Sequence, residues 1–181
     1  TYTAPGGTLQ RKIEQIQHVT TGGLYQQQDL NGVITRYRHD KLNRMLEETV
    51  GADTTEAATR HYAYRLLNQN DRGQAFEEAT DVKGVLTRTY LDGASRTLRQ
   101  ELQTLDENKQ PQTLPVHYQA RYDPLGNQAG ETLYDHYTQD GEERVVAVDF
   151  SFSYDGWGQR CKVERPDGVI EHRDFSPFGA N

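Results

Sequence analysis

Acidic residues recur in this sequence inside four-residue segments of one type, and carboxylates repeated in this way could act as general acids or as metal ligands. Each segment begins with Asp or Ser and ends with Gly or a substitute for it. The segments are 40–43, 92–95, 123–126, 155–158 and 176–179. A calcium site would need several oxygen ligands at close spacing, a Gly and a distal Glu, and no segment supplies this set. The placement therefore favours a structural role.

The best-defined segment, Asp123-Pro124-Leu125-Gly126, has the composition of a β-turn. A type I turn favours Asp in its first position, Pro in its second and Gly in its fourth. The Asp side chain accepts a backbone hydrogen bond, Pro fixes φ, and Gly adopts the left-handed conformation that follows the turn. A type I turn followed by a left-handed residue is a three-residue hairpin loop with a bulge, so we expect a hairpin tip here.

The other segments keep the two ends of this motif and vary its centre. The first position is occupied by Asp40, Asp92, Asp155 and Ser176, and the last by Asn43, Ser95, Gly158 and Gly179. An aromatic residue precedes each turn by one to three positions; these residues are Tyr37, Tyr90, Tyr122, Tyr154 and Phe175. An apolar residue follows the last position by three; these residues are Leu46, Phe76 (after Gly73), Leu98, Ala129 and Cys161. A degraded sixth copy is expected at either 64–69 or 70–73.

A second turn signal lies upstream of three of these segments. Gly32, Gly84 and Gly168 each follow a turn-forming residue, and each lies eight residues before the start of a segment. A turn, a strand of about six residues and a hairpin tip thus form one repeating unit. We expect the units to be successive antiparallel hairpins.

Other residue types that carry chemistry are dispersed. No two of the six histidines have the four-residue helical spacing of a zinc site. The single cysteine, Cys161, occupies the apolar position after a turn, so we expect a small packed residue and not a nucleophile. No glycine-rich phosphate loop is present. These patterns predict no cofactor and no metal.

The eleven tyrosines have two possible roles. Tyrosines that follow the repeat are expected to pack against one another from hairpin to hairpin. A sheet face rich in aromatic rings could instead stack on sugar rings. The aromatic residues outside the repeat are the candidates for such a ligand face; they are Tyr25, Tyr134, Tyr137 and Trp157.

Composition limits the class of protein. The net charge is −7, from 20 basic and 27 acidic side chains, and nucleic-acid binding requires a basic surface. The longest apolar run, 145–148, is far shorter than the roughly 20 residues of a membrane span. The sequence begins at Thr1 without Met, so we expect a piece of a longer chain.

Two segments, YDPLGN (122–127) and YDGWGQ (154–159), resemble the tyrosine-aspartate repeats of bacterial Rhs proteins, which follow Tyr-Asp-x-x-Gly-Arg after a Gly-containing turn. HDKLNR and LDGASR keep the Asp and the Arg of that motif, as Arg44 and Arg96. The resemblance covers most of 29–181 and is greatest to the B or C components of insecticidal toxin complexes. It implies a secreted bacterial protein in which long hairpin arrays coil into a hollow shell around a toxin polypeptide.

The same family carries an aspartic autoprotease signature of two Asp-Pro-x-Gly elements. Asp123 begins one such element here, but Asp155 is followed by Gly instead of Pro, and the last segment begins with Ser176. A catalytic dyad needs two carboxylates that share a proton. We therefore expect no self-cleavage and no enzyme activity.

We predict an all-β fold, an array of antiparallel hairpins in a long curved and twisted sheet, with poorly matched leading strands in 1–28 and five to six repeats in 29–181. The expected function is that of a non-catalytic shell segment, and the alternative is a surface module that binds a glycan or a protein. Expected partners are flanking repeats, a second toxin-complex subunit and the enclosed polypeptide, but neither nucleic acid nor membrane. Open sheet edges would also allow self-association.

Overall fold

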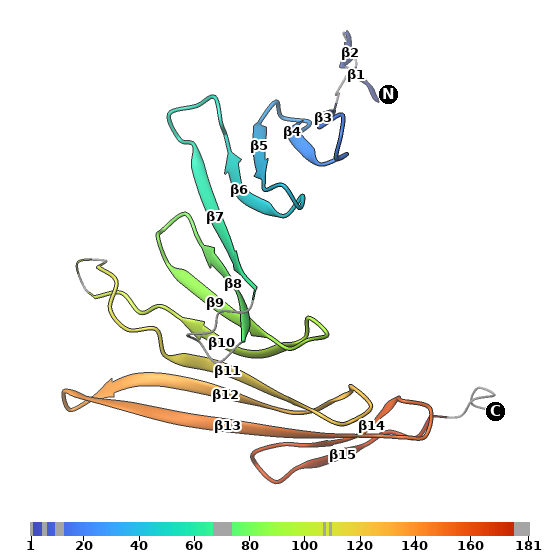
Figure 1. Cartoon of the computed structure of the whole chain (residues 1–181), viewed down its shortest axis with the longest axis vertical. Coiled ribbons are helices and arrows are strands. Elements are labelled where there is room, and N and C mark those ends of the chain that lie inside the picture. The colour runs from blue at the N-terminus through green and yellow to red at the C-terminus, as the bar shows by residue number, and fades with distance from the viewer. Residues whose placement is uncertain are drawn as a thin grey trace. The chain divides into compact units, whose positions relative to one another are not determined.

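The computed structural model describes residues 2–4, 7–9, 13–66, 74–106, 108 and 110–175, and all regular secondary structure in these residues is β-strand (Figure 1). The strands β1 (Tyr2–Ala4) and β2 (Gly7–Leu9) pair with each other in a separate sheet of two strands. From β3 to β15 the thirteen strands in the described residues follow one another in the hydrogen-bonded order of an antiparallel sheet. This order confirms the predicted all-β hairpin array.

The chain divides into two compact units, 1–64 with 78–86, and 65–77 with 87–181. The first unit contains β3 (Glu14–Gln17), β4 (Leu24–Gln28), β5 (Ile34–His39), β6 (Met45–Val50) and nearly all of β7 (Ala58–Arg65). The strand β8 (Ala75–Thr80) is divided between the units. In the first unit each strand from β3 to β7 pairs antiparallel with its neighbour in sequence.

The second unit contains most of β9 (Leu86–Leu91), together with β10 (Thr97–Leu102), β11 (Val116–Tyr122), β12 (Gln128–Gln139), β13 (Glu142–Tyr154), β14 (Arg160–Glu164) and β15 (Ile170–His172). Each strand again pairs with its neighbour in sequence. The strands β12 and β13, with 12 and 13 residues, form the long orange hairpin of Figure 1.

The sheet has little hydrophobic core in the part of the chain that the structure describes. Phe76 and Ala120, with 6% and 5% of their surface exposed, are the only buried apolar side chains there. A globular domain normally buries apolar side chains between two packed layers, and these units have no second layer. The backbone ladders and the side-chain pairs across neighbouring strands must therefore provide most of the stabilisation.

The two faces of the second unit differ in composition. Side chains can be assigned to a face because residues paired across antiparallel strands share one. In the second unit Arg99 pairs with Tyr90 on one side and with Gln119 on the other. Tyr118 is adjacent to Gln119 on β11, so its side chain points to the opposite face of the sheet. The face that contains Tyr118 is called the tyrosine face here; its residues are Tyr118, Tyr122, Phe150, Phe152 and Tyr154.

The opposite face, called the charged face here, carries paired ionic side chains. In the second unit it contains Arg88, Arg99 and Glu101, and Glu101 lies 3.1 Å from Arg99 and 3.6 Å from Arg88. In the first unit Glu47 lies between Arg38 at 2.5 Å and His61 at 3.5 Å. The face of the first unit that carries Tyr37 also has an ion pair, between Arg60 and Glu48 at 3.2 Å, so the contrast between the two faces holds for the second unit.

Candidate functional site

The acidic segments form hairpin tips of one geometry. In the first, the Asp40 N–H donates to the Arg44 carbonyl at 2.9 Å, and the Asn43 N–H donates to the Asp40 carbonyl at 3.0 Å. The segments 92–95, 123–126 and 155–158 repeat both bonds. The fourth residue has positive φ in each, with 61° at Asn43, 60° at Ser95, 92° at Gly126 and 76° at Gly158. This is the three-residue loop, a type I turn and a left-handed residue, that the motif predicts.

The aspartate side chains cap these loops. The Asp92 carboxylate accepts the backbone N–H groups of Ala94 at 2.8 Å and Arg96 at 2.9 Å. Asp40 and Asp155 accept the two equivalent backbone bonds. At Asp92 and Asp40 these hydrogen bonds favour the charged carboxylate. The backbone N–H of Arg96, with its guanidinium, lowers the pKa of Asp92 below the ordinary value, and Arg44 does the same for Asp40.

Asp123 is capped by a different partner. The side-chain amide of Asn127 donates to its carboxylate at 3.0 Å, and the Asn127 backbone N–H donates at 2.8 Å. The Asn127 side chain is the first cause of the lowered pKa of Asp123, and backbone N–H groups add to it. Every described turn carboxylate is thus occupied by bonds within its own loop. None is presented as a free acid or as part of a dyad.

The upstream turn signal also marks turns, because Gly32, Gly84 and Gly168 all lie in loops of this same type, which close the opposite ends of the hairpins. Asp29 and Asp81 accept the same pair of backbone bonds, and Gly32 and Gly84 follow with φ of 82° and 83°. The signal was present in the sequence, since DLNG and DVKG have the spacing of DPLG. The predicted turn dipeptides begin at Asn31 and Lys83, two residues after these aspartates, so the sequence pattern predicts the turn but not its aspartate cap. In the third such turn Arg165 replaces the aspartate.

The apolar position after each tip is a β-bulge. On β6, Leu46 has no cross-strand partner, because Arg38 pairs with Glu47 and His39 with Met45. The register shifts in the same way at Leu98, Ala129 and Cys161. A bulge inserts one unpaired residue and increases the local twist of its strand. The repeat therefore specifies a turn and also the bulge that follows it.

Arg96 links its own hairpin to the next one. Its guanidinium binds the Asp92 carboxylate at 2.7 Å and lies over the Tyr122 ring, 4.3 Å from the ring centre. The Tyr122 hydroxyl donates to the Thr97 carbonyl at 2.9 Å. Tyr122 is the last residue of β11, directly before the turn that begins at Asp123, so two separate contacts join one hairpin to another.

Arg44 repeats this arrangement in the first unit. It binds Asp40 at 2.6 Å and lies 4.6 Å from the centre of the Tyr64 ring. Tyr64 thereby takes the place of Tyr122, which favours 64–69 over 70–73 as the degraded sixth copy. Residues 67–73 lie outside the described part of the chain.

A third hairpin lacks the arginine but keeps the tyrosine bond. Asn127 occupies the position of Arg96, and the Tyr154 hydroxyl donates to the Gln128 carbonyl at 2.9 Å. Gln128 has the same offset from Gly126 that Thr97 has from Ser95. This hydrogen bond therefore recurs from one hairpin to the next without the arginine.

One predicted aromatic position, Tyr90, differs from this pattern. Tyr90 is not equivalent to Tyr122: it lies on the charged face, where its ring meets Phe76 at 5.6 Å and the Arg99 guanidinium at 4.0 Å. Its offset of two residues before the turn reverses its direction, because side chains alternate along a strand. Tyr37 lies three residues before its turn and is on the expected face, and burial and Glu48 raise its pKa. Phe175 is half exposed, and the turn from Ser176 to Gly179 lies outside the described residues.

The histidines and the cysteine do not share a common site. No group of three His, Cys, Asp or Glu suited to a metal is found within the described residues. The His136 ring contacts the Val116 carbonyl at 2.8 Å. The Cys161 thiol donates to the Ser153 carbonyl at 3.5 Å, as a packed bulge residue can. No helix in the described residues is long and apolar enough to span a membrane.

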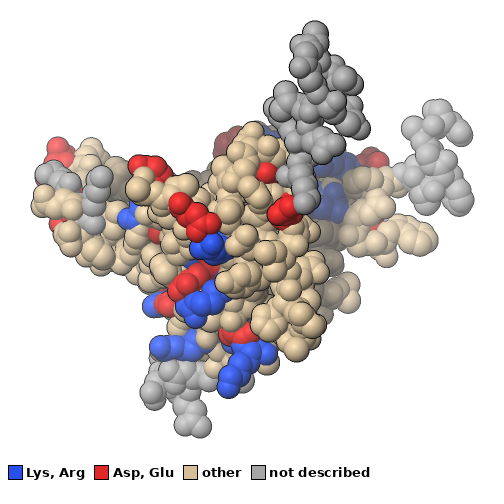
Figure 2. Space-filling model, turned by 90° about the horizontal axis from the view of Figure 1, so that it is seen from above, with Lys and Arg blue, Asp and Glu red and all other residues tan. Residues whose placement is uncertain are grey.

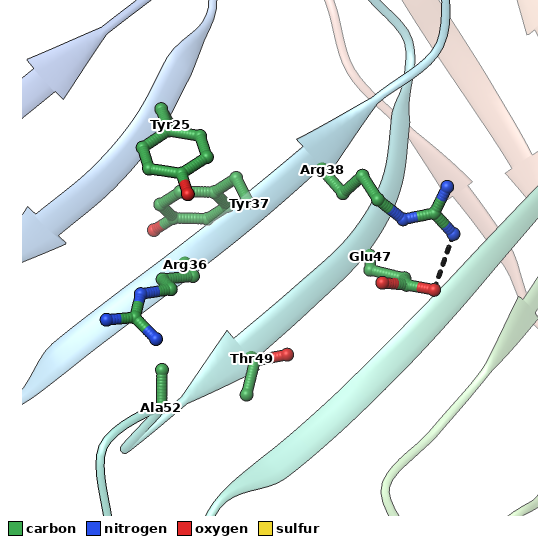
Figure 3. A pocket seen from close by; sticks show the side chains of 7 residues that line it. All are labelled: Tyr25, Arg36, Tyr37, Arg38, Glu47, Thr49 and Ala52. Carbon is green, nitrogen blue, oxygen red and sulfur yellow. Dashed lines mark hydrogen bonds and ion pairs between the residues drawn. The ribbon is translucent and has the colours of Figure 1, made fainter.

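The depressions on the units are shallow. One of about 310 Å³ in the first unit is lined by residues of β4, β5 and β6, including Tyr25, Tyr37 and Arg36 (Figure 3). Arg38 and Glu47, which are joined in Figure 3, occupy its other side. A larger one of about 560 Å³ lies over β13 and β14 on the second unit; its lining includes Phe150, Phe152 and Arg160.

The proposed ligand aromatics of the second unit do not form one platform. Tyr25 lies in the first unit, and the others lie in the second. Tyr134 and Tyr137 point to opposite faces of β12, because three residues separate them. Trp157 is 80% exposed at the tip of its hairpin. Acidic and basic side chains also lie beside one another on the visible surface, with no large field of one sign (Figure 2).

No family model matches the sequence, and no curated protein matches it. Solved structures similar to this chain include chains of Tc toxin complexes. A chain of the Photorhabdus luminescens Tc holotoxin pore aligns with 80% of this chain at 14% identity and a TM-score of 0.34, and 8% of that chain is covered. A chain of the TcdB2-TccC3-TEV structure aligns with 80% of this chain at 15% identity and a TM-score of 0.33, and 9% of that chain is covered. A chain of the TcdB2-TccC3-Cdc42 structure aligns with 90% of this chain at 14% identity and a TM-score of 0.33, and 9% of that chain is covered. The chain thus spans less than a tenth of each of these chains.

Proposed function

We propose that this chain is a non-catalytic wall segment of an Rhs-type shell that encloses a toxin polypeptide in a secreted bacterial toxin complex. The observation that carries the proposal is the single-layered hairpin array, in which Phe76 and Ala120 are the only buried apolar side chains among the described residues. Units that contact mainly their neighbours in sequence can be repeated to any length. Such a sheet is suited to enclosing a volume and poorly suited to building a pocket.

The resemblance of 122–127 and 154–159 to the tyrosine-aspartate repeats supports the identity of the shell. The ladder from β9 to β15 pairs backbone groups across the second unit. A continuous ladder leaves no gap through which an enclosed chain or a protease could pass. Flanking repeats of the parent chain would pair with the outer strands, and a second subunit would complete the enclosure.

A protease-protection experiment on the longer polypeptide that contains this segment tests the enclosure. We expect trypsin to leave an internal polypeptide intact as long as the native shell persists. Replacing both Gly126 and Gly158 with Val should strain two hairpin tips of the wall and expose that polypeptide. Equal digestion of the internal polypeptide in the native and the strained protein would contradict the proposal.

The proposed absence of catalysis has its own test. The turn carboxylates are held in loop-capping bonds, and Ser176 replaces the second acid of the autoprotease signature. We expect the folded chain to keep its full mass during days of incubation at neutral and at acidic pH. A specific fragment in the mass spectrum would show self-cleavage.

The depression over β13 and β14 favours one alternative, a surface module that binds a glycan. Phe150 and Phe152 line it, and the Arg160 guanidinium lies 4.8 Å from the Phe152 ring centre. A glycan array distinguishes the two functions. A hit that free sugar competes away and that Phe150→Ala abolishes would favour binding, and silence would favour the wall.

A further inference from the structure

Two hairpins are linked to the strand or hairpin that follows by the same three side chains. In the second unit Arg96 binds Asp92 at 2.7 Å and stacks on Tyr122 at 4.3 Å. In the first unit Arg44 binds Asp40 at 2.6 Å and stacks on Tyr64 at 4.6 Å. The acid and the arginine belong to one hairpin tip, and the tyrosine belongs to the element that follows. Each set of three is called a joint here.

We propose that Arg44 and Arg96 are positioning residues that fix each hairpin tip against the next element, and that these joints stay closed from neutral to mildly acidic pH. The proposal does not depend on what the sheet encloses. It assigns a role to the arginine of the repeat that turn formation does not require, since the tips at Asp81 and Asp155 form the same loop with Val85 and Gln159 in that position.

Arginine suits this task for a physical reason. Its planar guanidinium can bind a carboxylate along one edge and stack its flat face on an aromatic ring, which a lysine ammonium cannot do with the same geometry. Both joints are partly shielded from water to the same degree. The exposed side-chain fractions are 34% for Arg96 and 17% for Asp92, and 32% for Arg44 and 19% for Asp40. The similar values indicate one conserved geometry within this chain and not two accidental contacts.

The glycine of the neighbouring tip leaves space for the arginine. A Cβ atom on Gly126 would lie 2.9 Å from a terminal nitrogen of Arg96, although Gly126 belongs to the following turn. A Cβ on Gly158, whose preceding hairpin carries Asn127, would meet nothing within 4 Å. Of these two tips, a Cβ on the glycine would therefore crowd a neighbour only at Gly126, where the preceding hairpin tip carries an arginine.

The groups around Asp92 determine how the joint responds to pH. Arg96 faces it from its own turn, and Tyr122 lies beyond Arg96 on β11, next to Asp123, which is itself bonded to Asn127. No histidine belongs to this joint. Because the folded pKa of Asp92 is lowered from an ordinary value of 3.8, the stabilisation is complete above that value and is lost as the pH falls towards the folded pKa.

The Asp40 joint has more titratable neighbours. His18, His39 and Lys41 lie with Asp40 around one depression of about 380 Å³. The Asp92 joint is therefore the simpler one to titrate. The Arg96 Nε–H signal in the NMR spectrum of the complete chain reports the stack, because the Tyr122 ring current shifts it.

Asp81 provides the matched control. Its carboxylate accepts two backbone bonds of 2.8 and 2.9 Å, the same as those of Asp92, but no arginine follows at the fourth position. We expect the Arg96 signal to stay constant from pH 7 down to the ordinary aspartate pKa of 3.8, and to move together with the Asp92 carboxyl carbon only below it, because the pKa of Asp92 is lowered. Asp92→Asn should displace the signal already at pH 7, and Asp81→Asn should not. Arg96→Lys should lower the melting temperature although it keeps the charge.

Three results would overturn the proposal. One is an Arg96 signal without a ring-current shift at pH 7. Another is movement of that signal between pH 7 and 5, before Asp92 titrates. The third is an equal displacement by Asp81→Asn and Asp92→Asn, which would mean that general turn loosening and not the joint moves Arg96. Should Asp92→Asn fail to fold, Tyr122→Leu removes the ring and must abolish the shift.

Discussion

Gly126 and Gly158 have the same role in their turns but different surroundings. Both have positive φ, which costs a residue with a Cβ roughly 1–2 kcal/mol. Only at Gly126 would the new Cβ meet Arg96. We expect Gly158→Ala to lower the free energy of unfolding by about 1 kcal/mol and Gly126→Ala to lower it further. Urea denaturation of both variants measures the difference, and equal losses would show that Arg96 moves aside without cost.

Tyr122 and Tyr154 form a second matched pair. Each donates its hydroxyl to a backbone carbonyl at 2.9 Å, but only Tyr122 carries a stacked guanidinium. Replacing either with Phe should cost about 1 kcal/mol, the usual contribution of one hydrogen bond. Replacing either with Leu removes the ring as well, so the loss should be greater at 122 than at 154. Thermal melts of the four variants test this order; a greater loss at 154 would contradict it.

At the scale of the hairpin, the repeated unit is a capped loop, a bulge and a link to the next hairpin. The hairpin whose tip begins at Asp123 has the capped loop and the bulge, but Asn127 stands in place of the linking arginine. Asn127→Arg should place a guanidinium between Asp123 and the Tyr154 ring. We expect a gain of roughly 0.5–1 kcal/mol, the contribution of an exposed cation–π contact. A gain that persists in the Tyr154→Leu background would show that the added arginine acts elsewhere.

Local rules were sufficient to predict the hairpins, because the turn chemistry of Asp, Pro and Gly acts within four residues. The link between hairpins could not be predicted in this way, since Arg96 meets a ring 26 positions further along the chain at Tyr122. Tyr90 shows a second limit of prediction from the sequence. Its distance from the turn differs from that of Tyr122 by one residue, and in a strand one residue is enough to reverse the face.

At the scale of the whole molecule, a sheet without a second layer depends on its neighbours for cooperativity. In repeat proteins stability is approximately the sum of the units and of the interfaces between them. The charged and tyrosine faces both remain open to water, so removing one interface should unfold its neighbours only partly. Hydrogen exchange of the complete chain should accordingly show graded protection, greatest in β12 and β13, which share the longest ladder. Uniform protection of all strands would indicate a single cooperative unit.

The outer strands of the described sheet leave backbone groups without a neighbour. At the ends of the strand order, β3 carries Ile16 and β15 carries Ile170, which are about equally exposed. Such edges pair with other chains unless charged residues protect them. We expect the chain to associate with rising concentration in sedimentation experiments, and Ile16→Lys with Ile170→Lys to reduce this association. Leu125→Lys, at an exposed hairpin tip away from any edge, should leave it unchanged. A strict monomer at high concentration, or equal effects of edge and tip lysines, would show that the edges do not drive association.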